Sequence, residues 1–292
     1  PTGSPFSTTA VLALLIPIVT SRILAGKNLI SQVINSTLLT LFGVTIFLTG
    51  TWATWIAACL GLTLTLITPG FLGLINSLKQ FNLKEANLVT LACITIPVVI
   101  ILTVAALSFI PPIGTAKNYL YTQAQDFPGE TPIPFVASWK ISVSAFRDSP
   151  FWGTSPGTYL FNFTNYKPIE YNSSKTWNTR FDTAYNEYMQ VLATLGLVGV
   201  VALLSATALF LSSAYPLLRD NEGGLKTALA ISGLLFFILL ALHPSTLVLW
   251  VTGLILLASF YILNLSHDGT YRPLNSLSSI RDAFRSDAST QE

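Results

Sequence analysis

The sequence predicts an all-α fold, a polytopic transmembrane helical protein of about seven spans with one long helical extracytoplasmic loop. Composition is the first indication: of 292 residues, 51% are hydrophobic and only 10% are charged, whereas soluble domains carry about 25% charged residues. The second is that apolar residues gather in runs of about the length that crosses a bilayer. The third is a single long polar segment, rich in aromatic residues, that separates the runs into two groups.

Segment 1–110 is predicted to hold four transmembrane spans. No charged residue occurs between residues 28 and 77, a stretch too long for one span, so a turn is expected at Gly50–Thr51. Pro17 is a kink site in the first run. The four spans are expected at about residues 8–24, 31–49, 53–76 and 88–110.

Segment 186–265 is predicted to hold three more spans. The first begins with a cluster of polar residues, continues as a smooth apolar helix, and has Pro216 just past its end. The tail, 266–292, is rich in Ser, Asp and Arg and is expected to be disordered beyond a short helix near 278–286. The three spans are expected at about residues 186–213, 226–242 and 246–265.

The charge of the loops predicts the orientation. With seven spans, all the basic loops and the tail fall on one side, and the short turns at 50–52 and 243–245 fall on the other without Lys or Arg. Under the positive-inside rule the basic side and the C-terminus are cytoplasmic, and 111–185 lies outside. Because the chain begins at Pro1, within a polytopic pattern and without a basic leader, we expect further spans upstream in a longer protein.

Composition also bounds the chemistry. Both cysteines, Cys59 and Cys93, lie inside apolar runs, where they act as small hydrophobic residues. The two histidines, His243 and His267, form no metal-ligand cluster with them. We therefore expect no metal, no cofactor and no nucleic-acid partner, but contact with membrane lipids.

The outer segment, 111–185, is expected to be ordered because it is rich in aromatic residues. Ser138–Asp148 predicts an amphipathic helix in or near the membrane interface, with Trp139, Val143 and Phe146 on one face. A second short helix is expected from Pro156 to Tyr166, followed by an extended or looped stretch. Six basic residues lie in this segment, and some could bind an anionic head group such as a diphosphate. The alternative is that they are solvated surface charges, some of them paired with the five acids of the segment.

A longer pattern joins these features. The stretch SWKISVSAFRDSPFWGTSPGTYLFNF, followed after a gap by NEYMQVLATLGLVGVVALL, resembles the O-antigen ligase and polymerase family of bacterial inner membranes. The resemblance covers about 135–200 and extends loosely to the flanking spans. It rests on Trp139, Pro150, Gly153, Pro156, Gly157, Asn186, Tyr188, Gly196 and Gly199.

The resemblance implies a metal-independent glycosyltransferase of the bacterial cytoplasmic membrane. Such enzymes move a sugar chain from a polyprenyl diphosphate carrier to a glycan, lipid or protein acceptor. In the family, arginines hold the diphosphate and a histidine acts as base on the acceptor hydroxyl. Cations stabilise a leaving group that carries its own charge, and a base removes the acceptor proton.

Three positions depart from the family pattern. Tyr185 stands where the family has its histidine, and Trp52 stands where an earlier span often has an arginine. No arginine lies just before Trp139, and Lys140 is the nearest cation. An unperturbed tyrosine, with a pKa of about 10, is a poor base at neutral pH.

The site hypothesis is adjusted accordingly. The candidate catalytic residues are Glu187, Asp182 and Tyr185, and the candidate diphosphate ligands are Arg180, Arg147 and Lys140. Competing interpretations are a helix-dipole carboxylate for Glu187, an N-cap for Asp182, and helix packing for the motif glycines. The function could instead be that of a non-catalytic homologue that binds a lipid-linked glycan, or of a transporter. A transporter usually needs an ionisable residue deep in a span, which the predicted spans lack.

Overall fold

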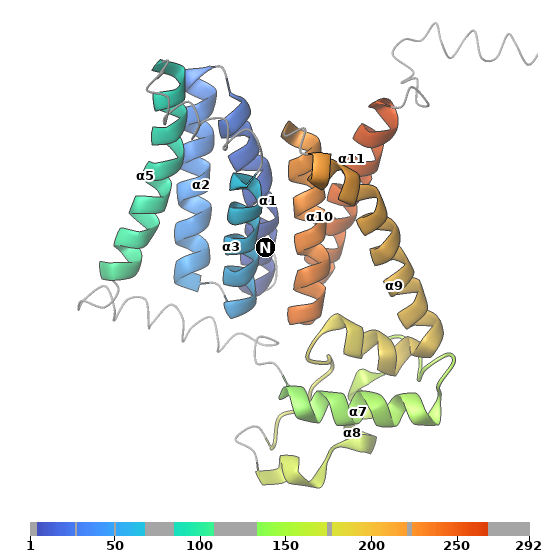
Figure 1. Ribbon diagram of the computed structural model, residues 1–292. Coiled ribbons are helices and arrows are strands. Elements are labelled where there is room, and N and C mark those ends of the chain that lie inside the picture. Colours follow the sequence, from blue (N-terminus) through green and yellow to red (C-terminus); the bar gives the residue numbers. More distant parts are fainter. Residues whose placement is uncertain are drawn as a thin grey trace, which may run out of the picture.

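The structure, a computed structural model, describes residues 5–26, 28–49, 51–67, 85–107, 133–173, 177–220 and 224–267. The regular structure within these ranges is entirely helical, which confirms the predicted all-α class. Long helices run side by side as one layer, and the shorter helices of the outer segment lie together at one end of it (Figure 1).

The N-terminal group contains α1 (Pro5–Ala25), α2 (Leu29–Thr49), α3 (Trp52–Leu66) and α5 (Glu85–Leu107). Helix α1 packs against α2, α3 and α10. Its alanines Ala10 and Ala13 are fully buried, so neighbouring helices can approach its backbone closely. The second half of the third predicted span, from residue 68, lies outside the described residues.

The C-terminal group contains α9 (Glu187–Asp220), α10 (Gly224–Leu242) and α11 (Leu247–His267). Helix α10 lies at the centre, in contact with α1, α3, α9 and α11. Three fully buried phenylalanines, Phe210, Phe236 and Phe260, come from α9, α10 and α11 and join the three helices in one apolar core.

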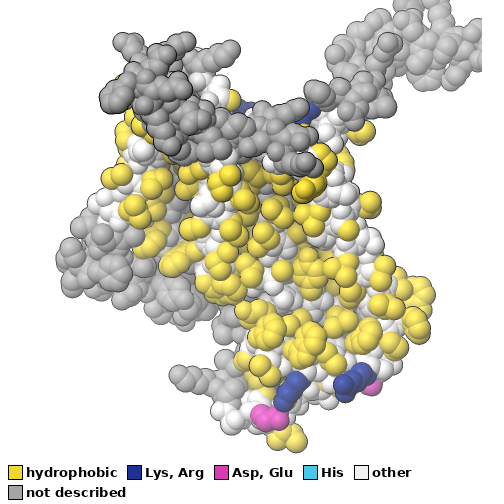
Figure 2. All heavy atoms as spheres, viewed as in Figure 1, with side chains coloured by type: hydrophobic (Ala, Val, Ile, Leu, Met, Phe, Trp, Pro, Cys, Tyr) yellow, Lys and Arg dark blue, Asp and Glu magenta, His cyan; other side chains and the backbone are white. Residues whose placement is uncertain are grey.

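In the described part of the chain, five helices are long and apolar enough to cross a membrane: α1, α2, α9, α10 and α11. Trp52–Leu66 and Leu88–Val104 are apolar but shorter. The protein is therefore a polytopic helical membrane protein, and the count of seven spans stays a prediction. One face of the helical layer is covered by hydrophobic side chains, whereas charged side chains gather on the outer segment (Figure 2).

Two expectations for the fifth span were wrong. The helix is not smooth, because Gly196 has φ 62° and ψ −152° and breaks α9 into two helical parts. Pro216 lies inside α9 and not beyond its end. Proline is tolerated within membrane helices where neighbouring groups satisfy the backbone.

The outer segment forms a second, smaller core. It contains α7 (Phe135–Asp148), α8 (Tyr159–Tyr166) and the 3-10 helix η1 (Ile169–Ser173), which occupies part of the stretch expected to be extended or looped. Small residues of α7 face inward, whereas Trp139 on its other face is half exposed. Members of the core come from α7, α8, η1, the first part of α9 and the chain just before α7 and α9: Ile133, Ala137, Ile141, Ala145, Tyr159, Phe163, Tyr171, Phe181, Ala184, Met189 and Ala193.

One aromatic contact shows that the start of α1 and the end of α10 lie together. Phe6, in the first turn of α1, stacks on His243, just past the last residue of α10, with ring centroids 3.6 Å apart. Arg22 in the last turn of α1 and Lys226 in the first turn of α10 therefore lie at the opposite end of the bundle.

Candidate functional site

The family-like turn and the break in α9 form one junction. Gly153 has φ 66°, and a Cβ on it would lie 2.4 Å from the carbonyl carbon of Thr194. A Cβ on Gly196 would lie 2.6 Å from the backbone nitrogen of Gly153. Only glycine at both positions permits this approach at such φ values.

Hydrogen bonds across this junction replace those that the broken helix lacks. The amides of Leu197 and Val198 donate to the carbonyl oxygens of Pro150 and Phe151, at 2.8 and 3.2 Å. In the other direction, Ser155 N–H donates to the carbonyl of Thr194 at 2.9 Å. The first part of α9 is thereby held against the outer segment, and the second part is aimed into the membrane layer (Figure 1).

The polar start of α9 is attached to the outer end of α10. Asn186 caps the helix, because its Oδ1 accepts the amide of Met189 at 2.9 Å. Its Nδ2 donates to the carbonyl oxygen of Ala241 at 2.9 Å, within the last turn of α10. Asn186 therefore links the outer segment to the membrane helices.

Glu187 lies at the same meeting point and is half buried. Its Oε2 accepts hydrogen bonds from the hydroxyl of Ser245 and, at 3.3 Å, from the amide of Ser245. The indole of Trp250 in α11 donates to the same Ser245 oxygen at 2.8 Å. Within the described chain, both hydrogen bonds to the carboxylate fall on Oε2.

Tyr185 is held by its backbone. Its amide donates to Ser138 Oγ at 2.9 Å, and that oxygen lies 3.0 Å from the hydroxyl of Tyr159. The ring of Tyr185 packs edge-on against Phe135, with centroids 5.3 Å apart. Burial raises the pKa of Tyr159 above its ordinary value, against the lowering effect of its hydrogen bond with Ser138.

The three predicted cations go to different places. Lys140 Nζ forms an exposed ion pair with Glu170 at 3.3 Å. Its charge and the backbone of η1 hold the pKa of that carboxyl below its usual range, the backbone hydrogen bond contributing most. Arg147 is exposed near the end of α7, and Arg180 lines a cavity beside α8. Neither Lys140 nor Arg147 lines that cavity among the residues described.

The other predicted residues are placed as follows. Asp182 is exposed on the segment before α9. Gly157 has φ 77°, but no atom lies within 4 Å of its potential Cβ. Gly199 follows the break in α9, and a Cβ there would lie 2.3 Å from Leu195 Cβ. No cluster of three or more His, Cys, Asp or Glu residues capable of holding a metal occurs within the described ranges.

Sequence reasoning missed two residues of the site, Ser245 and Trp250. They are 58 and 63 positions from Glu187, and no spacing rule links them to it. A signal that could have found Ser245 is the polar turn His243–Thr246, which separates two long apolar runs. A polar residue in such a turn often has a partner on a neighbouring helix end.

The fold and this site define a polytopic membrane protein with an outer helical domain fastened to one end of its bundle. A family model described as O-antigen ligase matches residues 6–204, from α1 to the second part of α9. The chain belongs to the O-antigen ligase family, as the resemblance of its motifs predicted. No curated protein matches the chain.

Proposed function

We propose that this protein transfers a glycan from a polyprenyl diphosphate carrier to an acceptor hydroxyl. Family membership supports this reaction class. The observation that carries the proposal is the position of Glu187, a half-buried carboxylate held by Ser245 where the outer segment meets the ends of α10 and α11. A lipid-linked donor has its reactive bond at this level, between the membrane and the glycan.

The proposed step assigns Glu187 as the base. The acceptor oxygen attacks the anomeric carbon, the bond from that carbon to the diphosphate breaks, and the diphosphate leaves with the electron pair. The acceptor proton moves to the Glu187 carboxylate, a contribution worth about 10²–10⁴-fold in rate. Asp182 and Tyr185 are the alternative bases.

Cations of the outer segment would stabilise the leaving diphosphate. Lys140 is paired with Glu170 and Arg180 lines a separate cavity, so we assign the diphosphate first to Arg147, the remaining predicted ligand. The acceptor can be a glycan, a lipid or a protein.

We also propose that the protein lies in the bacterial cytoplasmic membrane, with the outer segment extracytoplasmic and the tail cytoplasmic. The support is that Arg22 and Lys226 lie at the end of the bundle away from the outer segment, as the positive-inside rule requires of a cytoplasmic end.

A second candidate function is favoured by Tyr185. A phenol is a poor substitute for an imidazole base at neutral pH, so a tyrosine in place of the family histidine is what a homologue would carry if it bound a lipid-linked glycan without transferring it. No observation in the described residues favours the transporter alternative.

The test is transfer in reconstituted vesicles with a fluorescent polyprenyl-diphosphate oligosaccharide and a hydroxyl acceptor. We expect product from the wild type and at least about 100-fold less from Glu187→Gln at equal expression. Gln keeps an acceptor oxygen for Ser245, so the contact survives without the base. If Glu187→Gln and its combination with Asp182→Asn both transfer normally, the assignment of the base is wrong. If the wild type retains the donor but forms no product with any acceptor, the binding function holds instead.

A further inference from the structure

A cavity of about 460 Å³ lies in the outer segment, and Glu187 is not among its described lining residues. Its walls come from α8, from η1 and from the strip of chain before α9. The residues that carry the argument are Phe163, Lys167, Asn172, Trp177, Asn178 and Arg180. The volume is within the range of small-ligand sites, about 300–1,000 Å³.

The cavity has two cations and no acid among its described lining residues. Lys167 is fixed in place: its Nζ donates to the carbonyl oxygen of Trp177 at 2.9 Å and lies 5.0 Å from the ring centroid of Tyr171. Arg180 is exposed and adds a planar fork that can bind two oxygens of one anion. Together the two side chains favour a carboxylate or phosphate oxygen pair.

The rest of the lining suits a hydroxyl-rich molecule. The indole of Trp177 is 58% exposed and offers an apolar face on which a sugar ring can lie. The side-chain amides of Asn172 and Asn178 each supply donors and an acceptor for ring hydroxyls. An aromatic face, amides and fixed cations in one cavity match an acidic sugar better than a simple ion.

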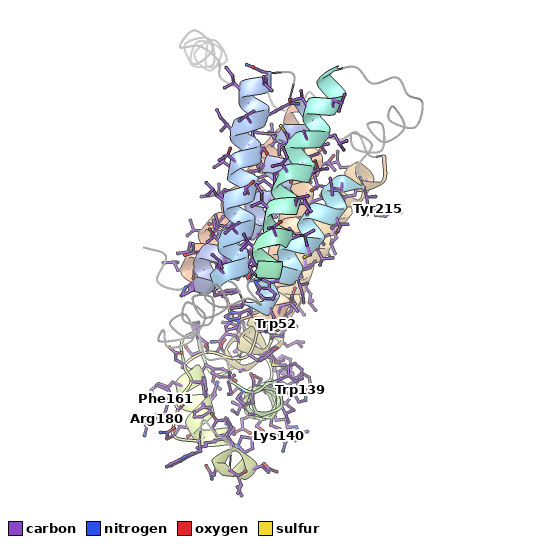
Figure 3. All side chains as sticks on the ribbon, turned by 90° about the vertical axis from the view of Figure 1, so that its left-hand side faces the viewer. Trp52, Trp139, Lys140, Phe161, Arg180 and Tyr215 are labelled. Atoms are coloured by element: carbon purple, nitrogen blue, oxygen red, sulfur yellow. The ribbon has the colours of Figure 1, made fainter. Side chains whose placement is uncertain are left out.

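This cavity lies away from the membrane surface, where the diphosphate of a lipid carrier is expected. Figure 3 shows Arg180 on the part of the outer segment that lies away from the transmembrane helices, whereas Trp52 marks their outer end. A carrier diphosphate stays at the membrane surface because its polyprenyl chain is in the bilayer. What extends as far as Arg180 is the glycan.

We propose that this cavity binds an acidic saccharide, with Lys167 and Arg180 on its carboxylate or phosphate and Trp177 against its ring. The role of that saccharide as part of the donor or acceptor glycan rests on the proposed function. The binding itself does not, because none of the described residues that line the cavity belongs to the Glu187 site.

The experiment is a binding titration with the full chain in lipid nanodiscs, read by tryptophan fluorescence. The probes are tetragalacturonate, its fully methyl-esterified form, the monophosphate of a neutral tetrasaccharide, and inorganic pyrophosphate. We expect both acidic saccharides to bind, with affinity falling as salt is raised. The methyl ester and pyrophosphate should bind at least 10-fold more weakly.

Three variants sharpen the result. Arg180→Gln should weaken binding of the acidic saccharides at least 10-fold. Arg22→Gln, which removes the same charge at the other end of the bundle, should leave binding unchanged. Lys167→Gln also removes the hydrogen bond to Trp177, so Lys167→Arg, which keeps the charge, is its partner variant. Lys167→Gln should lose binding of the acidic saccharides, and Lys167→Arg should keep most of it.

Two outcomes would overturn the proposal. If the ester binds as tightly as the acid and Arg180→Gln changes nothing, the cavity does not recognise an anion. If pyrophosphate binds through Arg180 while both acidic saccharides do not, the cavity holds the diphosphate. Glu187→Gln should bind the probes like the wild type. Binding of the acidic saccharides can therefore be judged even if the protein proves not to be a transferase.

Discussion

Gly153 and Gly196 pack backbone against backbone, and each has a positive φ, 66° and 62°. They are 43 residues apart, one in a turn after α7 and the other at the break in α9. The two motif segments that suggested the family are therefore in direct contact. Their glycines form the junction that holds the first part of α9, which begins at Glu187, against the outer segment.

The first prediction concerns this junction. Gly196→Ala and Gly153→Ala should each lower the thermal unfolding midpoint of the detergent-solubilised protein sharply, because the added methyl group meets backbone atoms. Gly157→Ala is the matched control. An alanine there would meet a similar left-handed backbone, with φ 77°, but nothing lies within 4 Å of its Cβ. The control should lower the midpoint much less, because alanine in a left-handed backbone lowers the free energy of unfolding by only about 1–2 kcal/mol. Equal losses in all three variants would contradict close packing at the junction.

The second prediction concerns Ser245, a positioning residue for Glu187. Ser245→Ala should lower kcat of transfer about 10- to 100-fold with little change in donor KM, because the carboxylate loses the hydroxyl that orients it. Ser245→Thr keeps the hydroxyl and should restore most of the activity. Ser212→Ala, which removes a hydroxyl that donates to the carbonyl oxygen of Leu209 within α9, is the control. A Ser245→Ala enzyme with wild-type kcat would show that this contact does not position a base.

The third prediction uses Tyr185. Tyr185→Phe should fold and transfer like the wild type, because the hydrogen bond to Ser138 comes from the amide and not from the hydroxyl. Tyr185→His should show transfer that rises as pH increases through about 6.5, where an imidazole becomes a base. The measurement is a pH–rate profile for both variants. Loss of transfer in Tyr185→Phe would shift the base assignment from Glu187 to the phenol.

The fourth prediction concerns alkaline stability. Burial raises the pKa of Tyr159 in the folded state, so the neutral phenol is favoured there. The stability this provides is present below the unfolded-state pKa of about 10 and is lost as pH rises through the folded-state pKa. Unfolding midpoints measured from pH 9 to 11 should therefore fall more steeply for the wild type than for Tyr159→Phe. Parallel curves would mean that Tyr159 ionises as easily folded as unfolded.

Local pattern was enough to predict most of the helices that the structure describes. Apolar runs gave α1, α2, α10 and α11 to within a few residues, and the spacing of Trp139, Val143 and Phe146 predicted α7. These features depend on neighbours within one or two helical turns, which sequence shows directly.

Long-range contacts decided what the sequence could not predict. The break at Gly196 requires the turn at Phe151–Gly153 to fill it, and an isolated reading of the apolar run favours a continuous helix. The partners of Glu187 come from the turn between α10 and α11, and Lys167 joins Arg180 only because the chain folds back after η1. The predicted catalytic and ligand roles themselves stay predictions.

The bend in α9 has a mechanical consequence. A helix break with unsatisfied amides can flex, but here the amides of Leu197 and Val198 are bonded to the carbonyls of Pro150 and Phe151. The outer domain is thus clamped to the bundle at this bend and again at Asn186, two anchor points that resist swinging about either one. Under the proposed assignment of Glu187 as the base, this double attachment favours a fixed wall over a lid, and we expect substrates to reach the carboxylate by diffusing sideways along the membrane surface.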